Sequence, residues 1–454
     1  MKLAEFKEKY IGDRAFYKRY LYLALPMIVQ NAITNLVSFL DNIMVGQLGT
    51  EQMSGVAIVN QLIFVYNLAI FGAVSAASIF GAQYYGKRNH KGHMYSFRFK
   101  LYAALLVTGL TILLFLTCGD NLISLYLTDT AGDGATDVAL GYGLQYLGIM
   151  VVGLVPFAVN QAYATNIKET GQTMVPMVAS FVAVGSNALL DYLLIFGIGP
   201  FPKMGIEGAA LATGLGQVVT LVLYLAFYFT RPLPVKIHKS CHVDRAMAGR
   251  LYAVGIPATL NMALPSLLIT ALNGILSAYS QVYVVVLGIY YKLQTFLYLP
   301  ANGIIQGMRP LIGYNYGAGE TKRVHRLFAD TLYLSLGIML FGTVYCQLFP
   351  DSLIALFSSN PETIQAGGMA LRIISLGFLV SSVSITSSGA LEGLGKGTPS
   401  LLISLCRYTI IIIPAAFILS RIFGASGVWY AFGITEFATA VIAYMTYRRA
   451  TIKN

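Results

Sequence analysis

Long apolar stretches alternate with short polar segments along most of the chain. Most of the stretches reach about 20 residues, the length that an α-helix needs to cross the hydrocarbon core of a bilayer. Clusters of charged and turn-forming residues separate them. The pattern predicts twelve membrane-spanning helices, at residues 20–45, 55–82, 99–119, 138–163, 174–196, 207–229, 251–276, 282–308, 327–349, 364–391, 398–420 and 427–447.

The composition agrees with a chain that lies almost entirely in lipid. Hydrophobic residues make up 56% of the sequence, charged residues only 11%, and the mean hydropathy is +0.68. A soluble protein could not cover its surface with so few charges. The first twenty residues are charged and amphipathic and lack the small-residue cleavage site of a signal sequence, so we expect the first helix to remain in the mature protein.

Lysine and arginine are distributed unevenly between alternate connections, and 25 of the 30 fall on one side of the predicted membrane. Basic connections resist translocation and remain cytoplasmic. This asymmetry predicts a multi-pass protein of the cell (inner) membrane with both termini in the cytoplasm. The net charge of +11 is then explained by loops that face anionic lipid, and we expect no nucleic-acid partner.

The two halves of the chain resemble each other at a constant spacing. Pro26 matches Pro257 and Gly86 matches Gly317, both 231 residues apart. A repeat of six helices is typical of a transporter made of two lobes with a cavity between them. We therefore predict a cytoplasmic segment, an N-lobe of helices 1–6, a cytoplasmic linker, a C-lobe of helices 7–12 and a cytoplasmic tail. Their bounds are 1–19, 20–230, 231–250, 251–447 and 448–454.

Two acidic residues fall inside predicted spans of the first half, where an ionisable group is costly and usually functional. Asp41 and Asp191 lie late in helices that both run outward, so they reach a similar depth. Asn187 precedes Asp191 by one helical turn, and Thr213 reaches comparable depth on the next helix. Their oxygen atoms could bind a proton or a small hard cation such as Na⁺. The alternative is that Asp41 caps a kinked helix and Asp191 merely ends one.

Four charges inside predicted spans of the second half are candidate charges of a C-lobe cleft. Long basic side chains can instead extend to the membrane surface, and the last two residues could form an internal ion pair. The four are Lys292, Arg372, Arg407 and Glu436.

Pro26 lies inside the first predicted helix, where proline removes a backbone hydrogen bond. It marks either a hinge or a static kink. The four cysteines show no CxxC spacing, which argues against a zinc site or a disulfide framework. The grouping of His238, Cys241 and His242 is weak, so we expect no metal beyond Na⁺ at the Asp41 site and no other cofactor.

Several segments together resemble the multidrug and toxic compound extrusion (MATE) transporters from about residue 20 to 447. The segments are Leu25-Pro26 with Asp41 and Met44-Val-Gly46, Asp191–Gly197, Gly205–Thr213, Leu299–Gln306 and Gly-Tyr-Asn-Tyr-Gly-Ala-Gly at 313–319. The resemblance implies an all-α fold of twelve helices in two pseudo-symmetric six-helix bundles. It also implies export of organic cations driven by inward H⁺ or Na⁺, with the ion site on Asp41, Asn187, Asp191 and Thr213. The segment Gly255–Pro265 has no acidic residue, which favours the DinF-like over the NorM-like branch.

The sequence therefore predicts a secondary antiporter that exports amphipathic, often cationic compounds by alternating access. The alternative is a flippase for lipids or lipid-linked saccharides from the same superfamily, to which basic residues in the second half would be suited. A membrane enzyme is disfavoured because no HExxH or GxSxG motif occurs, and ATP is not expected as the driver because no GxxxxGK[ST] loop occurs. We expect a monomer that contacts small organic molecules and membrane lipids.

Overall fold

The computed structural model describes residues 22, 25–34, 41, 43–125, 133–230 and 245–452. In these ranges the chain forms helices and no strand. The labelled helices are α3 (Thr50–Gly86), α4 (His90–Ser124), α5 (Asp133–Glu169), α6 (Met174–Phe196), α7 (Ile206–Thr230), α8 (Arg245–Ser277), α9 (Gln281–Gly317), α10 (Thr321–Leu348), α11 (Pro350–Ala355), α12 (Pro361–Gly393), α13 (Gly397–Leu405), η1 (Cys406–Ile410), α14 (Ile412–Phe423) and α15 (Ser426–Ile452). Residues 25–34 and 43–46 are also helical.

Eleven helices in the described ranges are long and apolar enough to cross a membrane. The helical stretch at 25–34 belongs to the remaining predicted span. The prediction of an all-α, multi-pass membrane protein is confirmed.

Several helices are longer than the spans predicted from the apolar runs, whereas α6 has the bounds that were predicted, 174–196. The longest, α3, α5 and α9, contain 37 residues each, or about 55 Å at 1.5 Å per residue, whereas the hydrocarbon core is about 30 Å thick. The predicted span 99–119 begins nine residues after α4 does, at His90. These predicted bounds were too short because an apolar run marks only the part of a helix that faces lipid.

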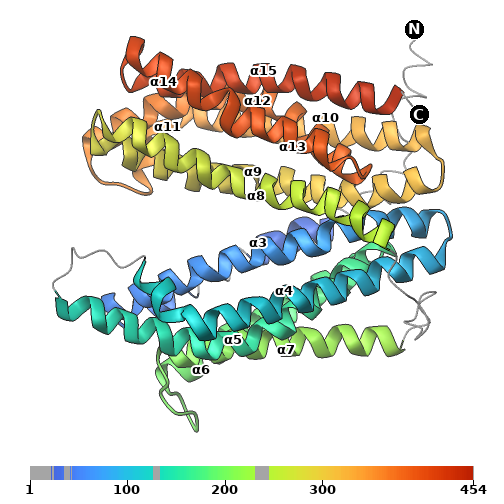
Figure 1. Cartoon of the computed structure of the whole chain (residues 1–454). Coiled ribbons are helices and arrows are strands. Elements are labelled where there is room, and N and C mark those ends of the chain that lie inside the picture. The colour runs from blue at the N-terminus through green and yellow to red at the C-terminus, as the bar shows by residue number, and fades with distance from the viewer. Residues whose placement is uncertain are drawn as a thin grey trace. The chain divides into compact units, whose positions relative to one another are not determined.

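The chain divides into two compact units of helices (Figure 1). Each unit has its own hydrophobic core. The first unit runs from Val29 to Tyr252, and the second comprises the chain up to Ile28 together with residues 253–454. In the described ranges, the first unit therefore contains α3 to α7 and the second contains most of α8 and everything after it. Ile28 packs against Gly303 of α9, where a side chain on Gly303 would come within 2.7 Å of Ile28 Cγ1.

Small residues bring α7 close to its neighbours in the first unit. A Cβ on Gly208 would lie 2.8 Å from the backbone of Leu194 on α6, and one on Gly153 of α5 would lie 3.2 Å from the Cα of Gly214. Such close approach is typical of helix packing in membranes. This packing also holds Asn187 of α6 next to α7, because a Cβ on Gly216 would lie 3.5 Å from the Cβ of Asn187.

In the second unit the eleventh predicted span is not a regular α-helix. Its middle turn, η1, is a π-helical turn in which the amide of Ile411 donates to the carbonyl oxygen of Cys406 at 3.1 Å. The α-helical segments α13 and α14 flank it. Single π-helical turns are rare and are frequently found at functional sites.

Candidate functional site

The first unit brings together the four residues that the sequence predicted for an ion site. Asn187 and Asp191 lie one turn apart on α6 and are only 5% and 1% exposed. The carboxyl groups of Asp41 and Asp191 are close enough to interact electrostatically with each other. The amide nitrogen of Asn187 donates to Thr213 Oγ1 over 3.5 Å, a long contact. Asp41 and Asp191 are called the carboxylate pair below.

The carboxylate pair presents acceptors that no donor satisfies. Asp41 Oδ1 and both carboxylate oxygens of Asp191 are buried without a hydrogen-bond partner. An unsatisfied buried acceptor is costly, and more so when it is charged. Oxygen atoms in this arrangement suit a proton shared between the two groups or a small cation bound by them.

A cavity of about 350 Å³ opens beside Asp41 within the first unit. Its lining mixes amides and hydroxyls with apolar and aromatic side chains such as Met150, Phe157 and Tyr224. Pockets that bind drug-sized ligands have about this size or more and a similar mixed lining. The polar and charged residues that line it are Gln30, Thr34, Asp41, Asn67, Asn160, Gln161, Lys168, Ser180, Asn187, Thr213, Gln217 and Thr220.

Two residues near the carboxylate pair were missed from the sequence. Tyr146 on α5 is 5% exposed and close enough to interact electrostatically with both carboxylates. Asn160, also on α5, donates to the backbone and side-chain oxygens of Gln217 at 2.8 and 3.1 Å, while its own Oδ1 has no partner. Asn160 could have been found if the search for polar residues inside the predicted spans had included amides as well as charged groups. A tyrosine in an apolar run carries no such signal.

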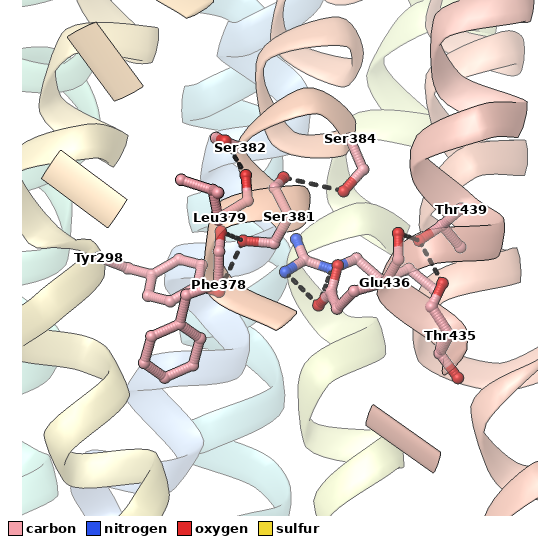
Figure 2. Close-up of polar contacts among 10 residues, drawn as sticks. Tyr298, Phe378, Leu379, Ser381, Ser382, Ser384, Thr435, Glu436 and Thr439 are labelled. Carbon is pink, nitrogen blue, oxygen red and sulfur yellow. Dashed lines mark hydrogen bonds and ion pairs between the residues drawn. The ribbon is translucent and has the colours of Figure 1, made fainter. Parts of the chain in front are cut away.

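Of the four charges predicted in the second half, Arg407 and Glu436 form an ion pair inside the second unit. Arg407 Nη2 lies 2.7 Å from Glu436 Oε1, and both side chains are almost fully buried. Figure 2 shows Glu436 on its helix beside Ser381 and Ser384 of α12. The internal pair considered from the sequence is present in the structure.

Lys292 and Arg372 lie in more exposed positions than Arg407 and Glu436. The ammonium of Lys292 lies 5.9 Å from the centre of the Phe357 ring. Arg372 is 57% exposed and lies 4.0 Å from Asp351, beside a surface pocket of about 650 Å³. At that exposure an ion pair contributes little stability.

Three further acids that the structure buries, Glu169, Asp330 and Glu392, were not singled out in the sequence. Glu169, at the end of α5, lies 2.5 Å from Lys100 Nζ, and Glu392, near the end of α12, lies 3.0 Å from Arg309 Nη2. Asn261 and Ser400 also donate to Glu392 Oε1. Lys100 lies at the start of the predicted span 99–119, and its side chain is fully buried.

Among the described residues, no group of three or more His, Cys, Asp and Glu side chains could hold a metal ion. The sequence grouping of His238, Cys241 and His242 lies outside those residues.

Comparisons with known proteins agree with this architecture. The MatE family model matches residues 26–193 and 257–418. A "Probable multidrug resistance protein NorM" from Thermotoga maritima is 26% identical over 91% of this chain and 88% of its own length. A "Multidrug export protein MepA" from Staphylococcus haemolyticus is 23% identical over 96% of this chain and 94% of its own.

Among solved structures, a MATE protein in a bent conformation is similar over 96% of both chains, with a TM-score of 0.87 and 21% sequence identity. That likeness concerns the fold, and it agrees with the prediction of twelve helices in two lobes. Since the family model covers more than half of the sequence in two blocks, one in each half, the chain belongs to the MatE family.

Proposed function

We propose that this protein is a secondary antiporter that exports amphipathic, often cationic organic compounds in exchange for H⁺ or Na⁺ by alternating access. The carrying observation is the carboxylate pair, which has buried oxygens without hydrogen-bond partners and of which Asp41 lines the cavity in the first unit. The names of the relatives as multidrug resistance and export proteins support the substrate class. The lack of an acid in Gly255–Pro265 supports a DinF-like branch.

The coupling step follows from the charge of the carboxylate pair. A proton or Na⁺ that enters from outside removes one negative charge from the pair, which weakens its attraction for a cationic substrate and favours release outward. Because a ligand shifts a conformational equilibrium only through differential affinity, ion and substrate must compete for this charge. An inward potential supplies about 2.3 kcal/mol per charge per 100 mV, or roughly fifty-fold accumulation at about 1.4 kcal/mol per factor of ten.

The test is flux in proteoliposomes under separately imposed H⁺ and Na⁺ gradients, with ethidium as the cationic probe. Asp41→Asn and Asp191→Asn keep the shape of the side chain but remove its charge, so each should abolish gradient-driven flux while the protein still inserts. Asp120→Asn is the matched control, because Asp120 is exposed on α4. It should transport like wild type.

Two outcomes would overturn the proposal. Wild-type flux with unchanged ion dependence in Asp41→Asn would show that the carboxylate pair is not the coupling site. Absence of ion-driven flux in the wild type, together with movement of labelled lipid between leaflets, would favour the flippase alternative.

A further inference from the structure

The Arg407–Glu436 ion pair is bonded asymmetrically. Nε and Nη2 of Arg407 both donate to Oε1 of Glu436, at 2.9 and 2.7 Å. The other carboxylate oxygen, Oε2, is buried without a hydrogen-bond partner. Oε1 of Glu436 therefore accepts two hydrogen bonds, whereas Oε2 accepts none and is available to bind a proton.

This ion pair is costly because both charges lose their hydration when they are buried. The side chains of Arg407 and Glu436 are only 7% and 11% exposed, and both residues lie near the middle of their spans. Replacing a buried ion pair with apolar residues is often neutral or stabilising, so packing alone does not account for it. In a membrane span, such a pair is by default a candidate functional site.

Polar groups surround the ion pair, and in the part of the chain that the structure describes no second formal charge acts on it. Among the described residues, the titratable groups that interact with it electrostatically are tyrosines: Tyr290, Tyr291 and Tyr298 on α9 and Tyr408 on η1. The α12 side contributes hydroxyls, with Ser384 next to Glu436 and Ser381 bonded to Tyr298 at 2.8 Å (Figure 2). The hydroxyls of Tyr291 and Thr435 are buried and unpartnered.

Backbone geometry brings the two charges to this place. Arg407 lies in the π-helical turn η1, and Glu436 lies on α15 where Gly377 of α12 leaves room for it, since a Cβ on Gly377 would meet Glu436 Cγ at 3.4 Å. Two local departures from ordinary helix packing thus coincide at one ion pair.

We propose that Glu436 is a second proton-binding site, at which a proton replaces Arg407 as the partner of the carboxylate. The proton binds to a carboxylate oxygen of Glu436, the hydrogen bonds from Arg407 break, and the site changes from net neutral to a charge of +1. A lone buried guanidinium is strongly unfavourable. Protonation is therefore coupled to a state in which water reaches Arg407, which ties proton binding to the conformational cycle.

This inference rests on the proposed antiport, but one of its two tests does not. In the first, infrared difference spectra between alkaline and acidic buffer are recorded on purified protein in lipid. The carbonyl band of a protonated carboxylic acid should include a component that is lost in the double variant Arg407→Gln/Glu436→Gln. The double variant is chosen because it leaves no unpaired charge, and its fold is checked by size exclusion and thermal unfolding.

The second test measures the number of protons moved per ethidium from the zero-flux potential in proteoliposomes. The number should fall by one in the double variant relative to wild type. Glu362→Gln, which removes an acid outside the buried core at the start of α12, should change neither the spectrum nor the proton count.

An unchanged spectrum and an unchanged proton count in the double variant would overturn the proposal and make the ion pair structural. If no variant and no wild-type sample shows gradient-driven flux, the antiport proposal fails, and the infrared band still decides whether Glu436 binds a proton.

Discussion

The ammonium of Lys100 lies 2.5 Å from Oε1 of Glu169, and neither side chain is exposed at all. The two residues join the start of α4 to the end of α5. Removing one partner leaves a buried charge without compensation, which in proteins costs about 3–5 kcal/mol. We therefore expect Lys100→Met to lower thermal stability in detergent by several degrees or to prevent purification.

The double variant Lys100→Met/Glu169→Leu should recover most of that loss, because it leaves no unpaired charge. Lys91→Met is the control, since Lys91 is exposed at the start of the same helix. A double variant as unstable as the single one would mean that the energetic role of the pair is misassigned.

Gly208 should tolerate no side chain. A Cβ at this position would lie 2.8 Å from the carbonyl carbon and oxygen of Leu194, so Gly208→Ala must push α7 away from α6. Overpacking of this kind costs about 1–3 kcal/mol, and it should also weaken ion binding by separating Thr213 from Asn187. Gly185→Ala on α6, where a Cβ meets nothing within 4 Å, should leave thermal unfolding in detergent unchanged. Equal stability of the two variants would contradict the close packing.

Tyr146 should affect how tightly the carboxylate pair binds its ion. Tyr146→Phe keeps the ring and removes a hydroxyl that interacts electrostatically with both carboxylates. We expect normal folding and a change of up to about tenfold in the ion concentration that gives half-maximal flux, equivalent to about 1.4 kcal/mol. Tyr102→Phe, at a position 59% exposed, is the control. Identical ion dependence in Tyr146→Phe would remove Tyr146 from the site.

Pro26 should matter for rate more than for folding. It is buried in the helical stretch 25–34, and Pro26→Ala restores a backbone donor. We expect insertion and thermal stability close to wild type and slower turnover, because the helix loses its bent alternative. Wild-type turnover would mean that the proline makes a static kink.

The orientation of the chain can be tested with reporter fusions. The distribution of basic residues predicts cytoplasmic signals after residues 92, 240 and 322 and external signals after 130 and 358. A cytoplasmic signal at 130 would break the twelve-span topology.

The sequence was sufficient for the class of fold because hydropathy is a direct consequence of lipid solvation, and the long apolar runs are helical wherever the structure describes them. It was also sufficient to group Asp41, Asn187, Asp191 and Thr213, since helical rise and direction determine depth. It could not reveal Glu169 or Glu392 as buried, because both lie near the ends of helices whose length beyond the apolar run is set by tertiary packing. Tyr146 was missed for another reason, since its role depends on which face of α5 meets the carboxylate pair.

The π-helical turn at Cys406–Ile410 also affects how the two halves of the chain are to be aligned. A turn closed from Ile411 to Cys406 contains one residue more than an α-helical turn, so every side chain after it is advanced by about 100° around the axis relative to a regular helix. Pro176 and Pro399, both near the start of the fifth helix of their half, are 223 residues apart. Beyond η1 the structurally equivalent spacing becomes 224, which pairs Asp191 with Ala415 rather than with Pro414.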